Sequence, residues 1–532
     1  AAPSRLHIQV AGRAARIPGN LYDSKCKKMA VADYLLRNFA KQLERYSFQA
    51  HGSGKSGIIQ VTRCGQEVLE RTACEIEEKT GNIIVRFEVG FPARGRTIQA
   101  GELIKILYQY LPACVEKALY YKNMDQNAVK RAAELAVDQE YIREQLKKEG
   151  LIAFVADGSI LPRESGVSQR PMKDAVPFVS PDSMKVTMKL PYKGVLTGMG
   201  IRKGITLVVG GGYHGKSTLL KALESGVYPH IAGDGREYVV TDDTAMKIRA
   251  EDGRSIRHTD ISMFINDLPN GRDTKDFSTA DASGSTSQAA GIVEAVEAGS
   301  RLLLLDEDTS ATNFMVRDAF MQKVVSPDKE PITPFLSRAG DLYEKAGIST
   351  ILVAGSSGAF FHIADTVIQM DQYEPVDITE KAKNLCGQFP IMQETAKPFV
   401  LPDSHRVMEK DRNGAVKRRD YRSGEVKKGE PERLKVKTLG VDGFMLGKQN
   451  VDLRYIEQLI DSEQTAALGL LLKYTVEHLV DGKRTISETA QWLEQKLEQE
   501  GMVFAAEHGV ISGGYAIPRI QEIYSCLNRY RV

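Results

Sequence analysis

The sequence predicts an α/β protein whose central domain holds a largely parallel sheet, preceded by an α+β domain and followed by a mainly helical domain. Two observations support this prediction. A glycine-rich loop, 210–217, stands between the apolar run 205–209 and a helix-like segment that starts at Thr218. Two more apolar runs, 301–305 and 350–354, follow it and alternate with helical segments. Short apolar runs that alternate with helices are typical of buried parallel strands.

The composition is that of a globular protein with several domains. The chain has 532 residues, 26 % charged and 42 % hydrophobic, with a net charge of +2. Because one core rarely grows beyond ~300 residues, we expect three domains, at 1–155, 156–379 and 380–532. The apolar runs are shorter than the roughly 18 residues of a membrane-spanning helix, which predicts a soluble protein. The six cysteines form no CxxC pair, which disfavours a zinc ribbon or disulfide framework and favours a reducing compartment.

The N-terminal region mixes helical and strand-like patterns. A helix is expected at 29–46, strands at 57–62 and 82–91, and helices between 100 and 150. Residues 1–56 carry ten Lys or Arg against three acids, and such an excess is typical of surfaces that meet nucleic-acid phosphate. The candidate RNA contacts in this region are Arg5, Arg13, Arg16, Lys25, Lys27, Lys28 and Lys55.

The segment 51–57, His-Gly-Ser-Gly-Lys-Ser-Gly, resembles a second phosphate-binding loop. A strand-like run follows it, where a phosphate loop requires a helix. We therefore interpret it as a basic turn, whose lysine and backbone N–H groups remain able to hold RNA phosphate.

The loop at 210–217 matches a phosphate-binding loop at every position. In this context the backbone N–H groups and the following helix N-terminus face an anion. Lys216 supplies a mobile positive charge, and the Ser217 hydroxyl is placed to ligate Mg²⁺. The residues expected to bind ATP are Gly210, Gly211, Gly212, Tyr213, His214, Gly215, Lys216, Ser217 and Thr218.

Two acids follow the apolar run 301–305. In phosphate-loop ATPases a hydrophobic strand ends in a carboxylate that holds Mg²⁺, and a second acid polarises the attacking water. The sequence therefore predicts Asp306 as a metal ligand and Glu307 as the general base, with Lys216 as the second catalytic residue.

The region upstream of Asp306 indicates the branch of ATPase. Cassettes of the ABC class carry a Leu-Ser-Gly-Gly-Gln signature that opens a helix ahead of the strand-end aspartate. At the corresponding place this chain has Ser283-Gly284, followed by a helix-like stretch at 288–296. Because the N-terminus of a helix attracts anions, we expect Ser283 and Gly284 to face a γ-phosphate held by a second protomer.

Longer stretches resemble the predicted ABC-class ATPase family. They are 154–159, 169–171, Gly198-Met199-Gly200 and 306–314. Within the family the chain is similar to the branch of kinetoplastid mitochondrial ATPases associated with RNA editing. The resemblance covers nearly the whole chain. It implies a non-transporter ABC fold, ATP and Mg²⁺ as ligands, a homodimer, RNA as a partner and the mitochondrial matrix as the compartment.

Two positions depart from the transporter pattern, which predicts slow hydrolysis. Gly355-Ser356-Ser357 stands where the switch histidine is expected, and no glutamine loop is evident, Asn266-Asp267 being the nearest polar candidate. Tyr192 precedes the phosphate loop at a distance that permits stacking on adenine, although a core or surface tyrosine is the favoured interpretation.

The C-terminal region contains a basic segment, 403–437, with twelve Lys or Arg against seven acids. We expect an exposed hairpin or loop in which Lys417, Arg418 and Arg419 are either solvated or in contact with RNA. Apolar residues at helical spacing then predict helices at 453–460 and 466–474.

Together these features predict an ATPase that closes as a dimer around ATP and binds or remodels RNA. Two alternatives stay open: a nucleotide-gated scaffold in a protein complex, with incidental hydrolysis, and the ATPase subunit of a transporter. A scaffold has no need of a general base such as Glu307. The large added domains disfavour a transporter subunit.

Overall fold

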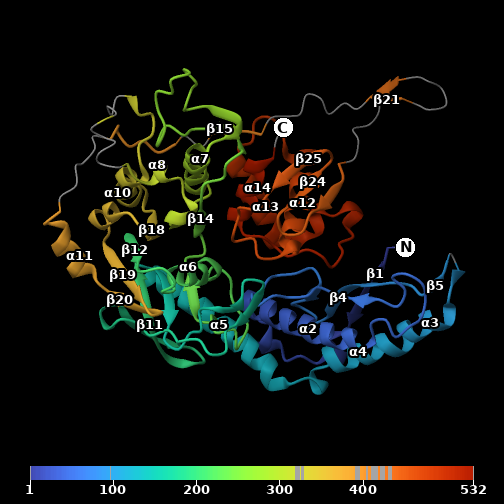
Figure 1. The fold of residues 1–532 in the computed structure, drawn as a ribbon. Coiled ribbons are helices and arrows are strands. Elements are labelled where there is room, and N and C mark those ends of the chain that lie inside the picture. The colour runs from blue at the N-terminus through green and yellow to red at the C-terminus, as the bar shows by residue number, and fades with distance from the viewer. Residues whose placement is uncertain are drawn as a thin grey trace.

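The computed structural model describes residues 2–95, 97–317, 324, 329–389, 396–402, 405–408, 417–419, 426–428 and 434–530. Figure 1 shows three lobes, in which the C-terminal lobe lies against both the central and the N-terminal one. Among the described helices, none combines the length and the apolar character that crossing a bilayer demands.

The N-terminal lobe packs helices on a four-stranded antiparallel sheet. The sheet has the order β1 (Ser4–Val10), β4 (Ile83–Val89) and β2 (Ile59–Gln60), and β3 (Cys74–Ile76) also pairs with β4. Alternate β4 side chains are buried, as expected of a sheet with one covered face. Helix α2 (Lys25–Tyr46) covers the sheet, and α4 (Leu111–Leu119) and α5 (Gln126–Glu149) pack against α2. Phe87 of β4 meets Phe39 of α2 edge to face, with ring centroids 5.6 Å apart.

The central lobe contains two sheets. The larger has the order β14 (Met246–Ile248), β17 (Leu302–Asp306), β18 (Ser349–Val353), β12 (Ile205–Val209), β19 (Thr366–Asp371) and β20 (Glu374–Asp377). Its first five strands are parallel, and β20 is antiparallel. The smaller sheet is antiparallel, with the order β10 (Lys185–Leu190), β11 (Gly194–Arg202), β7 (Leu151–Ala156) and β13 (Val239–Thr241).

Helices and a hairpin complete the central lobe. They are α6 (Lys216–Ser225), α7 (Gly284–Glu297), α10 (Phe335–Ala346), α11 (Thr379–Cys386) and the hairpin of β15 (Arg254–Thr259) with β16 (Phe277–Ala282). Every residue of β17 is buried, because the parallel sheet is covered on both faces. This confirms the predicted α/β class.

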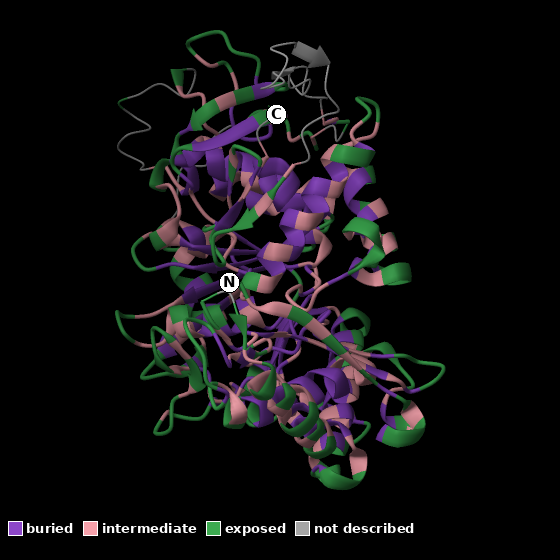
Figure 2. Cartoon of the chain, turned by 90° about the vertical axis from the view of Figure 1, so that its right-hand side faces the viewer, coloured by how far each residue is buried: buried purple, intermediate pink, exposed green. Residues whose placement is uncertain are grey.

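The C-terminal lobe combines a small sheet with helices. The elements are β23 (Val436–Thr438), β24 (Gly443–Leu446), β25 (Gln449–Asp452), α12 (Ser462–Tyr474), α13 (Ile486–Glu500) and α14 (Ile520–Arg529). Its buried side chains form one continuous cluster with those of the central lobe. Figure 2 colours the buried residues purple. The two lobes therefore share a core.

Two expectations about elements are corrected. The predicted helix at 453–460 is a series of turns, although Leu453 and Leu459 are buried as the pattern required. The strand expected at 57–62 is reduced to Ile59–Gln60. In both places buried apolar side chains are held by tertiary packing without the regular backbone that their spacing suggested.

The basic segment contains a hairpin of β21 (Lys417–Arg419) with β22 (Val426–Lys428). The side chains of Lys417, Arg418 and Arg419 lie outside the described part of the chain.

Candidate functional site

The phosphate loop joins the end of β12 to the start of α6, as predicted. Gly210 has φ +143°, and a Cβ there would lie 2.4 Å from the carbonyl oxygen of Met370. Gly215 caps α6 with φ +97°. Both positions combine a left-handed backbone with close neighbours, so both require glycine.

The Lys216 side chain is folded over the loop. Its Nζ donates hydrogen bonds to the carbonyl oxygens of Gly210, at 2.7 Å, and Gly211, at 2.8 Å. The ammonium group therefore sits above the loop, on the side where phosphate would be received. Ser217, the next residue, is exposed in the first turn of α6.

The predicted metal ligand and base lie at the same edge of the sheet as the loop. Since β12, β17 and β18 are parallel, their carboxyl ends meet there. Asp306 ends β17 in register with Val353, is 9 % exposed, and accepts a hydrogen bond from the Asp308 N–H at 3.1 Å.

Three donors from the segment after β18 hold the Glu307 carboxylate. Gly355 N donates to it at 2.6 Å and Ser356 N at 3.0 Å, and the Ser356 hydroxyl donates to the other oxygen. Burial on its own would raise the pKa of Glu307, but these hydrogen bonds outweigh it and lower the pKa below its ordinary value. Glu307 is thus ionised at neutral pH, as a base must be. Ser356 contacts it from the place where the switch histidine was expected.

These residues fit a Mg²⁺-bound nucleoside triphosphate. The loop offers backbone N–H groups and a lysine, and the carboxylate of Asp306 and the hydroxyl of Ser217 are oxygen ligands of the kind that Mg²⁺ prefers. The fit follows from this donor set and from the open space beside the loop, since a Cβ built on Gly212 would meet no atom within 4 Å.

The signature residues open α7, as predicted. Ser283 is exposed and caps the helix, with its Oγ accepting from Thr286 N at 3.4 Å. A Cβ on Gly284 would lie 3.2 Å from Asp252 Oδ1, a tight approach. One turn later, Gln288 bonds Ser310 Oγ and the N–H of Ala311, both at 2.9 Å. The start of α7 is therefore tied to the segment that follows Glu307.

The segment Arg249–Asp252 after β14 was missed by the sequence reasoning. Because β14 is parallel to β17, this segment lies at the same sheet edge as Asp306. Glu251 N donates to Ser287 Oγ of α7 at 2.8 Å. Asn266, the candidate that the sequence suggested for a glutamine loop, instead bonds the carbonyl of Ser262. A three-residue strand gives almost no periodicity, so β14 was hidden in the sequence.

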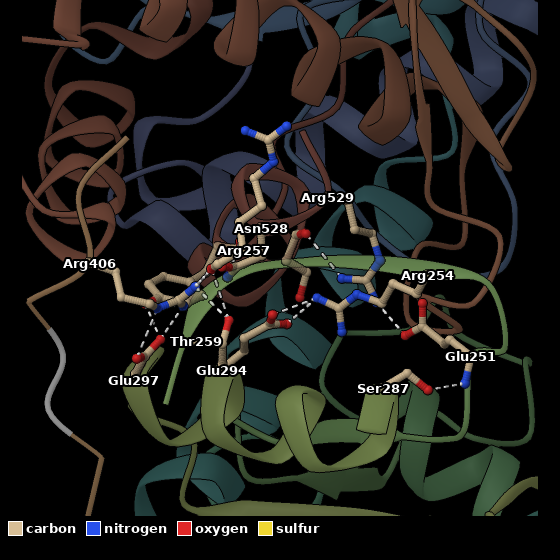
Figure 3. Close-up of polar contacts among 12 residues, drawn as sticks. Glu251, Arg254, Arg257, Thr259, Ser287, Glu294, Glu297, Arg406, Asn528 and Arg529 are labelled. Carbon is tan, nitrogen blue, oxygen red and sulfur yellow. Dashed lines mark hydrogen bonds and ion pairs between the residues drawn. The ribbon is translucent and has the colours of Figure 1, made fainter. Parts of the chain in front are cut away.

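Buried ion pairs connect this region to the C-terminal lobe (Figure 3). Arg529 of α14 pairs with Glu251 at 2.5 Å, and both side chains are about one-tenth exposed. Arg254 pairs with Glu294 of α7 at 2.5 Å. Glu297, one turn further along α7, is held by Arg406 and by the Tyr524 hydroxyl of α14 at 2.7 Å.

The candidate RNA contacts are spread over the N-terminal lobe. Ser4 pairs with Val89, next to the turn that carries Lys55, which places Arg5 and Lys55 near one end of the sheet. Arg13 and Arg16 follow the other end of β1, about 20 Å away for a seven-residue strand. The exposed residues of the set are Arg5, Arg13, Arg16, Lys25 and Lys55, whereas Lys27 and Lys28 are half-buried.

Two observations refine this set. Lys27 pairs with Asp23 at 2.9 Å, so its positive charge already has an acidic partner. A cleft of about 560 Å³ separates the N-terminal sheet from the C-terminal lobe, and Arg5, His7 and Arg86 line its N-terminal wall. The sequence did not suggest His7 or Arg86, because their place in a cleft follows from the pairing of β1 with β4.

Three family models match the chain. They describe the P-loop domain of ABC ATPases, over residues 125–404; the N-terminal part of ATPases of the ABC class, over 1–122; and the MRB1590 C-terminal domain, over 435–532.

The chain is also similar to individual proteins. The uncharacterized protein MJ1628 of Methanocaldococcus jannaschii is 29 % identical over 308 residues, which cover 56 % of this chain and 67 % of that protein. Among solved structures, MJ1267, an ATP-binding cassette of an ABC transporter in its ADP conformation, is 10 % identical with a TM-score of 0.27. CbiO1 of Clostridium perfringens, part of the ABC transporter complex CbiONQ, is 14 % identical with a TM-score of 0.28. Each structural match covers 45 % of this chain and 96 % of the other.

Proposed function

Because the chain belongs to the ABC ATPase family, we propose that it binds and hydrolyses ATP with Mg²⁺ between two copies of itself, and that this closure drives RNA binding or remodelling. The observation that supports hydrolysis most strongly is the meeting of Lys216, Asp306 and Glu307 at one sheet edge.

In the proposed reaction Lys216 leaves the loop carbonyls and binds the terminal phosphates. Bound Mg²⁺ would neutralise phosphate charge, held by Ser217 and Asp306. Glu307 orients the attacking water and accepts its proton. The Gly355 and Ser356 donors hold this carboxylate in its ionised form.

The dimer is proposed from α7. Ser283 is exposed at a helix N-terminus, where a partner's γ-phosphate would be stabilised. Sedimentation tests this step. Glu307→Gln with ATP is expected to sediment as a dimer, and adding Ser283→Glu, which opposes a carboxylate to phosphate, is expected to give a monomer that still binds ATP. A dimer that forms without ATP and persists in Ser283→Glu would refute the proposed ATP-dependent closure.

The RNA role is proposed from the cleft that Arg5, His7 and Arg86 line, from the resemblance to the RNA-editing-associated branch, and from the match of residues 435–532 to the MRB1590 C-terminal domain. The contacts of α14 with Glu251 and with Glu297 of α7 give closure a route to the cleft, since one wall of the cleft belongs to the C-terminal lobe. A mitochondrial location and a part in RNA editing belong to the same proposal.

RNA binding is tested by its salt dependence. Affinity for single-stranded RNA should fall steeply with salt, because phosphate contacts release counterions. Arg5→Ala with Lys55→Ala should flatten the log–log slope by up to about 1.4, that is about 0.7 per lost contact. Lys381→Ala, an exposed lysine of α11 in the central lobe, is the matched control. Affinity independent of salt would contradict the RNA proposal and favour a nucleotide-gated scaffold.

A transporter subunit is the weaker alternative. The surface formed by Glu251 and the neighbouring part of α7, next to the sheet edge, is occupied by α14 of the same chain. A membrane partner would have to displace buried ion pairs to dock there.

A further inference from the structure

The order of the strands fixes the direction in which a bound nucleotide runs. Asp306 and Glu307, which act at the γ-phosphate end, follow β17, and β17 and β18 lie on one side of β12. β19 lies on the opposite side of β12. A nucleotide whose phosphates fill the loop after β12 therefore extends its nucleoside towards the end of β19.

The turn after β19 is bonded to the phosphate loop. It consists of Gln372 and Tyr373, between the paired residues Asp371 and Glu374. Gln372 N donates to Nδ1 of His214 at 2.9 Å. A Cβ built on Gly215 would lie 3.3 Å from Cδ1 of Tyr373, so the ring borders the first turn of α6.

The turn keeps a conformation that its residues disfavour. Gln372 has φ +47° and Tyr373 has φ +74°, and two consecutive positive φ angles in a two-residue hairpin are typical of a type I′ turn, where Asn-Gly is preferred. Side chains of this size at positive φ cost free energy, and such strain gathers at functional sites. Burial of the Tyr373 ring does not offset this cost, because the residue is 56 % exposed.

We propose that the Gln372–Tyr373 turn is the nucleoside subsite, in which the Tyr373 ring stacks on the base or ribose of the bound nucleotide. This assignment rests on the proposed ATP-binding function. It also explains the backbone strain of the turn, because the left-handed conformation places the Tyr373 ring beside the phosphate loop. Stacking uses the π-face that every base has, so Tyr373 contributes affinity without selecting one base.

Tyr192 is the competing tyrosine. It is 50 % exposed, in the turn between β10 and β11, and its backbone N–H donates to Asp138 of α5 at 2.9 Å. The neighbouring Lys193 lies over the ring of Tyr238, 4.8 Å from its centroid. The contacts of this turn are with α5 and with Tyr238, whereas those of the Tyr373 turn are with the phosphate loop.

Calorimetric titration of the full chain with MgADP and with magnesium pyrophosphate tests the subsite. Both ligands bear phosphate, and only ADP bears a nucleoside. Tyr373→Gly removes the ring and suits the positive φ, so the turn is retained. It is expected to weaken ADP by about five- to fifty-fold and to leave pyrophosphate unchanged. Tyr373→Phe should bind ADP as wild type does, and so should Tyr192→Ala.

The possible failures are distinct. Wild-type protein that binds neither ligand would refute the proposed function itself. ADP affinity unchanged in Tyr373→Gly, or ADP and pyrophosphate weakened equally, would overturn the subsite alone. A loss of ADP affinity in Tyr192→Ala but not in Tyr373→Gly would assign stacking to Tyr192 instead.

Discussion

Replacing Arg529 with Met tests whether α14 holds the segment after β14. Arg529 Nη2 lies 2.5 Å from Glu251 Oε1, and the two side chains are 9 % and 10 % exposed. Removing one partner of a buried pair leaves the other charge unpaired, which costs about 3–5 kcal/mol. Glu251 keeps no equivalent cation, because Arg254 is already engaged by Glu294. We therefore expect Arg529→Met to lower the free energy of unfolding by about 3 kcal/mol.

Trp492 reports this change directly. It is the only tryptophan of the chain and packs in the C-terminal lobe against Tyr474, with ring centroids 5.8 Å apart. Urea unfolding followed by its fluorescence should show the loss for Arg529→Met and a substantial recovery when Glu251→Gln is added. Arg454→Met is the matched control. Arg454 pairs with Asp452 at 3.0 Å on the surface, and its loss should leave the free energy of unfolding nearly unchanged, because water screens exposed ion pairs. Equal losses for Arg529→Met and Arg454→Met, or no recovery in the double variant, would refute the reasoning.

Three further predictions concern the site and its pH dependence. Ser356→Ala should raise the pKa of Glu307 by removing a hydrogen bond to the ionised form, so the acid limb of the ATPase pH–rate profile should move to higher pH; an unmoved limb would contradict this. Gly210→Ala should reduce ATP affinity at least about ten-fold, because its Cβ would lie 2.4 Å from the Met370 carbonyl oxygen at φ +143°; a fluorescent-nucleotide titration that shows wild-type affinity would exclude the constraint. Burial raises the pKa of Glu224 to about 7, so the stability it contributes is complete below its ordinary pKa of 4.5 and is lost as pH rises through about 7. Glu224→Gln should therefore remove about 1–3 kcal/mol of the difference in unfolding free energy between pH 5 and pH 8, and identical pH dependence in the two proteins would argue against it.

The predictable part of the site is local in sequence. The phosphate loop and the Asp306-Glu307 pair each stand next to a strand with a clear apolar pattern, so their chemistry follows from neighbours along the chain. The start of α7 was predictable for the same reason, since Ser283 is a helix-capping residue followed by a helix.

The remaining contacts depend on strand pairing over long separations. Ser356 reaches Glu307 only because β17 and β18 are neighbours, and Arg529 reaches Glu251 across 278 residues. The helix predicted at 453–460 failed for a related reason, because Leu453 and Leu459 are buried by turns that pack on the rest of the lobe. Hydrophobic periodicity indicates which side chains are buried. It does not determine the backbone conformation where tertiary contacts hold those side chains in place.

Steady-state ATP hydrolysis, measured with and without single-stranded RNA, tests the central claim most directly. Glu307→Gln controls for contaminating activity, and Glu344→Gln, an exposed glutamate of α10, controls for the substitution itself. We predict slow hydrolysis by the wild type and by Glu344→Gln, stimulated by RNA, and none above background by Glu307→Gln. Hydrolysis that persists in Glu307→Gln would contradict the assignment of the base, and Glu307-dependent hydrolysis that RNA leaves unchanged would contradict the coupling to RNA.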